Sequence, residues 1–228
     1  MNNAEKGRGT SRSTATTITP ASPVSSPTTL YLASQSPRRL QLLGQLGMEP
    51  ALLLPDDSED AEALETVNPG ESPLAYVKRV TAAKGKAAWA RLEKRGLPPA
   101  PILVADTTVA LGSAILGKPG DAKTAKAMLK QLSGQWHRVL TSVRLQTGPG
   151  SQAVQITTRS DVLFADLSDR QIDAYVATGE PLDKAGAYAI QGGAAAFVVR
   201  LRGSYTGIIG LPLHETGLLL QQAGVTPP

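Results

Sequence analysis

"LYLASQSPRRLQLLGQLG", residues 30–47, predicts a strand, a polar turn and a helix in direct succession. The apolar run at 30–33 is typical of a buried strand, and the leucines that follow recur at the spacing of one helix face. Ser36 suits the N-cap of that helix, and Pro37 suits its first position. Because α/β folds are built from such strand–helix units, this stretch indicates the fold class.

Arg38 and Arg39 stand in the first turn of this predicted helix, where the helix dipole favours acidic residues instead. Free backbone N–H groups at a helix N-terminus, together with forked guanidinium groups, suit a phosphate group. The residues alone leave two readings open. The turn is either an anion site or a solvated helix end with two surface arginines.

Strands and helices alternate along the rest of the chain. Further strands are expected at 51–54, 101–111, 114–116, 137–147 and 153–167, with a hairpin pair at 194–210. Helices are expected at 72–95, 121–132, 168–178 and 211–223. This order predicts an α/β fold with a mixed, twisted sheet flanked by helices.

Length and composition limit the size of the domain, the extent of the N-terminal tail and the cellular compartment. The 228 residues, 41% of them hydrophobic, suffice for one domain or for two lobes around a central cleft. Fifteen of the twenty residues from 10 to 29 are Ser, Thr or Pro, so 1–29 is expected to be a disordered tail before a domain at 30–228. The chain has no cysteine, which suits the reducing cytoplasm. No apolar run approaches the roughly 20 residues of a membrane span, so no membrane partner is expected.

The net charge of +4 and the pI near 9.4 indicate an anionic partner, either nucleic acid or nucleotide. Aromatic residues make up only 4% of the chain, which leaves few side chains on which single-stranded bases could stack. A stable nucleic-acid partner is therefore not expected.

Asp106 interrupts the apolar strand at 101–111. A buried, unpaired carboxylate is costly, so an aspartate in this place usually serves a metal, a cation or catalysis. The alternative is a strand-end aspartate that caps a neighbouring turn. Glu59 and Asp60, in the acidic stretch at 55–65, either help Asp106 to hold a hard cation or belong to a solvated loop.

Lys118 and Gln191 are candidates for ligand contacts. Lys118 follows a short strand, and the Pro119 after it excludes a P-loop, which needs a hydroxyl there. Gln191 precedes two glycines and a predicted small-residue strand, and its amide offers one donor side and one acceptor to a base. His137 and His214 are isolated and are expected to be structural.

Seven segments in order resemble the Maf family of nucleoside triphosphate pyrophosphatases, relatives of the inosine triphosphate pyrophosphatases. They are "LASQSPRR", "YVKRVTAAKGKA", "VADTTV", "LGKPGDAKTAKAML", "LSGQWHRVLTSV", "PLDKAGAYAIQG" and "GSYTGIIGLPLHET". The segment with "DKAGAYAIQG" is similar to the branch that acts on dTTP and UTP.

The resemblance implies an inosine triphosphate pyrophosphatase-like fold and hydrolysis between the α and β phosphates, with Mg²⁺ or Mn²⁺ as cofactor. Modified pyrimidine nucleotides are further candidate substrates, so non-standard nucleotides would thereby leave the nucleotide pool. It also implies a cytoplasmic homodimer. Asp106 would activate water and share the metal, and Thr107 and Gln191, with Arg38, would govern substrate choice. The residues lining the triphosphate would be Ser34, Arg38, Arg39, Lys84 and Lys118.

A second reading, from another class, is a basic nucleic-acid-binding or cell-division regulatory module without catalysis. Release of pyrophosphate from UTP, compared with retention on DNA, distinguishes the two.

Overall fold

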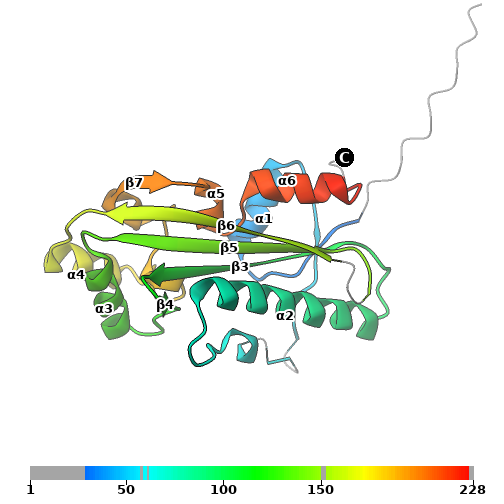
Figure 1. Cartoon of the computed structure of the whole chain (residues 1–228), viewed down its shortest axis with the longest axis horizontal. Helices are drawn as coiled ribbons and strands as arrows, with labels where there is room; N and C mark the ends of the chain where they lie inside the picture. The colour runs from blue at the N-terminus through cyan, green and yellow to red at the C-terminus, as the bar shows by residue number, and fades with distance from the viewer. Residues whose placement is uncertain (1–28, 57–58, 61, 150–152, 226–228) are drawn as a thin grey trace, which may run out of the picture.

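A computed structural model describes residues 29–56, 59–60, 62–149 and 153–225. Seven strands form one mixed sheet in the order β2-β1-β3-β5-β6-β7, and β4 pairs with β3 outside this order (Figure 1). The strands are β1 (Tyr31–Leu32), β2 (Ala51–Leu52), β3 (Ile102–Leu111), β4 (Ala114–Leu116), β5 (Trp136–Gln146), β6 (Ala153–Phe164) and β7 (Val198–Arg202). The β1–β2 and β1–β3 pairs are parallel and the other pairs are antiparallel. The expected α/β class and mixed sheet are confirmed.

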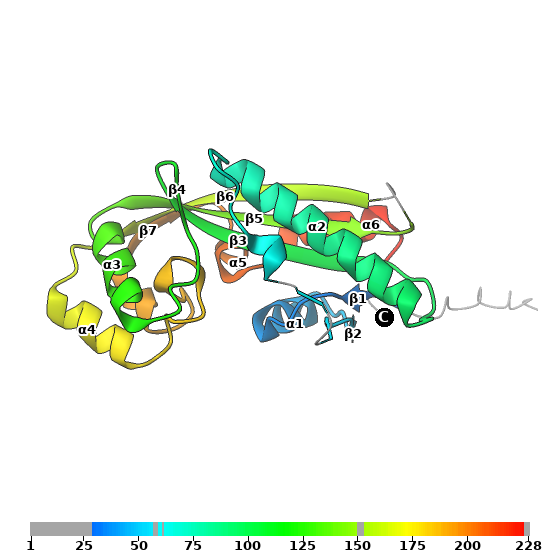
Figure 2. The same ribbon diagram turned by 90° about the horizontal axis from the view of Figure 1, so that it is seen from below.

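Helices cover both faces of this sheet. They are α1 (Pro37–Gln45), α2 (Pro73–Lys94), α3 (Ala122–Leu132), α4 (Asp169–Ala177), α5 (Tyr205–Ile209) and α6 (Leu213–Gln222). Helix α2 lies along one face, and α1, α5 and α6 lie on the other (Figure 1). Helices α3 and α4 gather at one end of the long strands, away from α1 and α6 (Figure 2). None of the helices in the described part of the chain is long and apolar enough to cross a membrane.

Local signals account for the helix starts. Ser72 accepts a hydrogen bond from the Ala75 backbone N–H at the start of α2, and Asp121 accepts one from Thr124 at the start of α3. Helix α4 begins with a capping box, in which Ser168 and Gln171 each bond the other's backbone N–H. These three expected helices are confirmed, with ends within a residue or two of prediction.

The expected hairpin at 194–210 is wrong. This segment forms a 3₁₀ helix, η3 (Gly193–Phe197), then the single strand β7, then α5. Ser204 accepts a hydrogen bond from the Gly207 backbone N–H and so starts a helix where a second strand was expected. The small-residue strand expected after Gln191 is also wrong, because η3 occupies that place.

The core divides at the sheet. The larger cluster joins α1, α3, α4, α5 and α6 to the sheet, with Leu43, Leu129 and Phe164 almost fully buried within it. A smaller cluster places Trp89 and Leu92 of α2 on the opposite face.

The tail expected to be disordered lies outside the described residues, apart from Thr29.

Candidate active site

The edge of β3 is open over five residues, and the candidate site is built there. Strand β1 pairs with β3 at Ile102 and Leu103, and β4 pairs with it from Val109 onward. Among the described residues no strand pairs with the 104–108 edge between them. Consecutive side chains of a strand point to opposite faces, yet Asp106 and Thr107 both line the cavity at this edge. A gap in the sheet makes that possible.

The cavity measures about 620 Å³, which is ample for a nucleotide. It is bounded by the turn before α1, by α2, β3 and β4, and by the segment at 183–191. The eight residues predicted as catalytic or substrate-binding all line it: Ser34, Arg38, Arg39, Lys84, Asp106, Thr107, Lys118 and Gln191.

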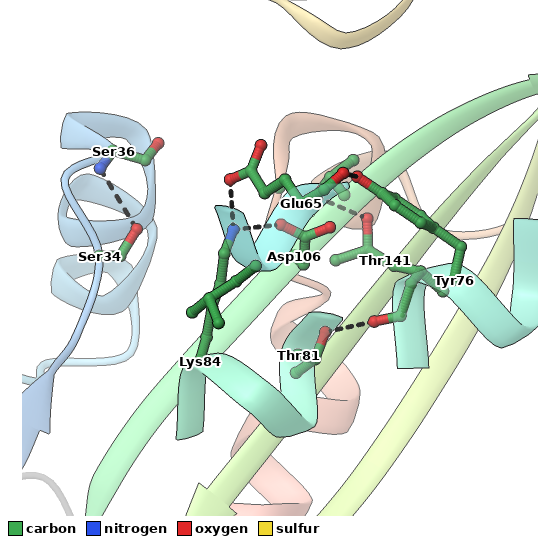
Figure 3. Close-up of polar contacts among 12 residues, drawn as sticks. Ser34, Ser36, Glu65, Tyr76, Thr81, Lys84, Asp106 and Thr141 are labelled. Carbon is green, nitrogen blue, oxygen red and sulfur yellow. Dashed lines mark hydrogen bonds and ion pairs between the residues drawn. The ribbon is translucent and has the colours of Figure 1, made fainter. Parts of the chain in front are cut away.

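Lys84 stands at the centre of the charges. Its Nζ donates to Asp106 Oδ1 at 2.6 Å and to Glu65 Oε1 at 2.7 Å (Figure 3). Gly85, the next residue of α2, lies so near the sheet that a Cβ there would be 2.8 Å from the Arg144 side chain. This close approach of helix and sheet brings the Lys84 ammonium to the strand carboxylate.

Glu65 lines the cavity and pairs with Lys84, and it is a candidate site residue that sequence reasoning missed. It ends the 3₁₀ helix η1 (Ala63–Glu65), whose position is fixed by a 2.9 Å hydrogen bond from the Tyr76 hydroxyl to the Glu65 carbonyl (Figure 3). Burial raises the pKa of the Glu65 carboxyl, but Lys84, Lys118 and Arg39 outweigh burial and hold that pKa below its usual value. Glu65 is therefore ionised at neutral pH. Burial, together with Asp106 and Glu65, raises the pKa of Tyr76 to about 12, so its hydroxyl stays a donor.

Glu59 and Asp60, which were expected to help hold a metal, lie away from the cavity. Glu59 makes a forked pair with Arg91, at 2.7 Å to both Nε and Nη2, and that hydrogen bonding lowers the pKa of Glu59. Asp60 accepts a hydrogen bond from the Ala63 backbone N–H. Neither lines the cavity, and the described residues hold no group of three or more His, Cys, Asp or Glu placed to bind a metal ion. Nothing in the acidic stretch marks Glu65 as the inward carboxylate, because the contacts that turn it inward come from α2.

The two arginines of α1 differ in their surroundings. The Arg39 guanidinium donates to the Gly210 carbonyl at 2.9 Å, to Ser34 Oγ at 3.0 Å and to Thr107 Oγ1 at 3.5 Å. Burial lowers the pKa of Arg39, and Asp106 opposes that effect. Arg38 is half-buried at the cavity, and its guanidinium makes no hydrogen bond or ion pair to any residue that the structure describes. Arg39 therefore holds the surrounding segments of the site together, whereas the Arg38 side chain remains available to a ligand.

The turn before α1 provides no side-chain cap for the helix, and the Arg39 backbone N–H donates to the Ser36 carbonyl at 3.1 Å. Ser36 occupies the N-cap, as expected, but its side chain makes no capping hydrogen bond. The Ser36 backbone N–H instead donates to Ser34 Oγ at 3.2 Å (Figure 3). The same Ser34 oxygen accepts from Arg39, so Ser34 fixes both the turn and the guanidinium.

The remaining predicted residues lie on the cavity rim and wall. Lys118 follows β4, is half exposed and lies 3.7 Å from Glu65. Thr107 Oγ1 is 3.0 Å from Thr141 Oγ1 and so belongs to the same network as Arg39. His137 is buried beneath the site, with Nε2 2.9 Å from the Tyr188 hydroxyl, while His214 is exposed on α6; neither lines the cavity.

The described arrangement can bind a polyanion and hold one acid–base group against it. Six cationic side chains line the cavity that holds the Asp106 carboxylate, and Lys84 pairs with that carboxylate directly. Phosphoryl transfer depends on positioning and on neutralising charge, and these groups supply both.

Comparison with known proteins places this chain among nucleotide enzymes. A family model described as Maf-like protein matches residues 29–223. A protein of Albidiferax ferrireducens named dTTP/UTP pyrophosphatase is 60% identical over 195 residues, which cover 86% of this chain and 96% of that protein. Its namesake in Cupriavidus pinatubonensis is 59% identical, over 85% of this chain and 96% of that protein.

Among solved structures, the Staphylococcus aureus Ham1 protein aligns with a TM-score of 0.39 and 13% identity. The alignment covers 60% of this chain and 72% of that one.

Proposed function

The chain belongs to the Maf-like protein family, and we propose that it hydrolyses dTTP and UTP to the nucleoside monophosphate and pyrophosphate. The observation that carries this proposal is the Lys84 ammonium between Asp106 and Glu65, inside a cavity that five further cationic side chains line. A nucleic-acid-binding or division-regulating module has no need of a carboxylate enclosed by cations, whereas a phosphoanhydride hydrolase needs both. Modified pyrimidine nucleotides are proposed as further substrates, and by hydrolysing them the enzyme would remove non-standard nucleotides from the pool.

The cationic side chains bind and neutralise the triphosphate. Arg38, Lys84 and Lys118 line the cavity and would pair with the phosphate oxygens. Phosphate oxygens then replace the carboxylates as partners of Lys84, which frees an Asp106 oxygen. Asp106 takes a proton from the attacking water as the water oxygen bonds to the α-phosphorus and the bond to the β-phosphate oxygen breaks.

A divalent cation, Mg²⁺ or Mn²⁺, fits the donor set. One oxygen each of Asp106 and Glu65 converge on a single positive group, and two carboxylates with water and phosphate oxygens are what Mg²⁺ usually takes. Asp106 and Glu65 would hold the cation, which would supply further neutralisation of the phosphate charge. Glu65 thus takes the place that Glu59 and Asp60 were expected to fill.

Gln191 is the proposed reader of the base. Uracil and thymine present an N3–H donor beside the O4 acceptor, and one amide side chain can pair with both. Gln191 is exposed at the cavity, where a base can reach it.

We also propose that the enzyme acts as a homodimer in the cytoplasm, where its substrates are found.

A product assay tests the function. The purified chain is incubated with UTP, dTTP, CTP, GTP and ITP with Mg²⁺ or Mn²⁺, and products are separated by ion-exchange chromatography. UMP and dTMP, with equimolar pyrophosphate, are expected from the first two. UDP with orthophosphate, or no turnover of any of the five, contradicts the proposal.

A further inference from the structure

The turn that carries Gln191 is held at both ends by side chains that lie outside the catalytic centre. This base turn, residues 189–193, is closed by a hydrogen bond from the Gly192 backbone N–H to the Ala189 carbonyl at 3.0 Å. Gln191 stands at its tip, exposed at the cavity. An exposed side chain on a short turn has no packing of its own to fix it, so its position depends on what holds the turn.

Tyr175 of α4 holds the first end. Its hydroxyl accepts a hydrogen bond from the Ala189 backbone N–H at 3.0 Å, and both residues are more than 90% buried. The Tyr175 ring also packs against Phe197, and a Cβ on Gly193 would lie 3.2 Å from that ring. The ring thus touches the turn from beneath while its hydroxyl bonds the turn's start.

Glu180 holds the other end and is joined to Tyr175. Its Oε2 accepts from the Gly193 backbone N–H at 3.3 Å, and its Oε1 accepts from the Tyr175 hydroxyl at 2.6 Å. A Cβ on Gly192 would lie 2.1 Å from the Glu180 carboxylate, so only glycine allows the carboxylate this close to the turn. The two side chains and both ends of the turn form one hydrogen-bonded unit.

We propose that Tyr175 and Glu180 form a clamp that fixes Gln191 and thereby sets the preference for uracil and thymine without touching the nucleotide. The inference rests on the proposed function, since Gln191 has a base to read only if a nucleotide binds here. Uracil offers a donor at N3 and an acceptor at O4, whereas cytosine offers the reverse pattern. A turn held at both ends keeps the Gln191 amide within reach of the N3–H and O4 of uracil or thymine, and a turn released from the clamp would lose that pairing.

A double-mutant cycle tests the clamp. Tyr175→Phe keeps the ring and removes the hydroxyl, and it is compared with Gln191→Ala and with the double variant, using kcat/KM for UTP and CTP. Tyr175→Phe is expected to lower kcat/KM for UTP about tenfold and to change CTP less than twofold. In the Gln191→Ala background the same substitution is expected to have no effect, because a positioning residue acts only through what it positions.

Two further variants separate the clamp from general stability. Gly192→Ala displaces the Glu180 carboxylate and is expected to reduce the UTP-to-CTP ratio as Tyr175→Phe does, so it replaces that variant should Tyr175→Phe fail to fold. Tyr31→Phe removes the hydroxyl of another buried tyrosine, outside the cavity, and is expected to keep the ratio.

The outcomes distinguish the inference from the proposed function. Equal losses on UTP and CTP, or losses that multiply in the double variant, overturn the clamp while leaving the hydrolase intact. A wild-type chain that releases no pyrophosphate from UTP overturns the proposed function and the clamp with it.

Discussion

Lys84 is the residue on which the charges of the cavity converge, and its neighbours show what a sequence can reveal at this scale. Asp106 was identifiable because an acidic residue interrupts an apolar strand, a local anomaly with a physical cost. Glu65 was not identifiable, because six acidic residues share the stretch at 55–65. Only contacts from α2, more than ten residues away in the chain, turn Glu65 inward and Glu59 toward Arg91.

Glu65 and Glu59 make a matched pair for mutation. Glu65→Gln is expected to reduce kcat at least about tenfold, because one of the two carboxylates at the centre of the site loses its charge. Glu59→Gln is expected to keep kcat and to lower the melting temperature, because the buried Arg91 loses its ionised partner. Steady-state kinetics on UTP and a thermal melt of each variant measure both effects. If Glu59→Gln lowers kcat and Glu65→Gln does not, Glu59 rather than Glu65 serves the catalytic centre, and this assignment is wrong.

His137 makes stability depend on pH. Burial lowers the pKa of its imidazole to about 4, against about 6.5 in an unfolded chain. Between these values the unfolded chain binds the extra proton, so the free energy of unfolding falls as pH drops from about 6.5 to 4, by up to about 3 kcal/mol. His137→Gln is expected to flatten this slope in urea titrations at several pH values. His214→Gln, on the exposed face of α6, should keep the wild-type slope, and a steep slope in both variants excludes His137 as the cause.

At the scale of elements, prediction succeeded where a local signal starts the element. Ser72 with Pro73, Asp121 and Ser168 are caps readable from the chain, and α2, α3 and α4 begin beside them. The hairpin at 194–210 failed because its apolar pattern suited strands while the Ser204 cap inside it started a helix. The open edge of β3 was beyond local signals, since it depends on how short β1 and β4 are and on which residues they pair.

The two arginines of α1 are expected to affect the stability of the free protein in opposite directions. Arg38→Ala is expected to raise the KM for UTP and to stabilise the free protein slightly, because a cation at a helix N-terminus costs about 0.3–1 kcal/mol. Arg39→Ala is expected to destabilise the free protein, because Gly210, Ser34 and Thr107 lose a donor. Chemical denaturation without nucleotide separates the two. An Arg38→Ala variant that is less stable than wild type contradicts this assignment.

At the scale of the molecule, three long strands carry one site between two groups of helices. Helix α2, which carries Lys84, lies along one face of the sheet and α1 lies on the other (Figure 1), and the segments with Lys118 and Gln191 complete the lining of the cavity. The α/β class was predictable because strands and helices alternate in the sequence. The cavity was predictable only through resemblance, since its eight residues come from segments up to 157 positions apart.

The tail before the domain is expected to be dispensable. Residues 10–29 hold few apolar side chains, and the family model begins at residue 29. A chain starting at Thr29 should therefore keep the melting temperature and the kcat of the full chain. A loss of several degrees on truncation would show that the tail packs on the domain.

The central claim, that this cavity hydrolyses triphosphates with Asp106 as the base, is tested most directly by kcat of Asp106→Asn at saturating UTP and divalent cation. The amide keeps the shape of the carboxylate and cannot take the proton, so kcat should fall at least about 100-fold while UTP still binds. Asp161→Asn, on β6 and paired with Arg159, is the matched control and should keep kcat. An Asp106→Asn variant with near-wild-type kcat would contradict the account.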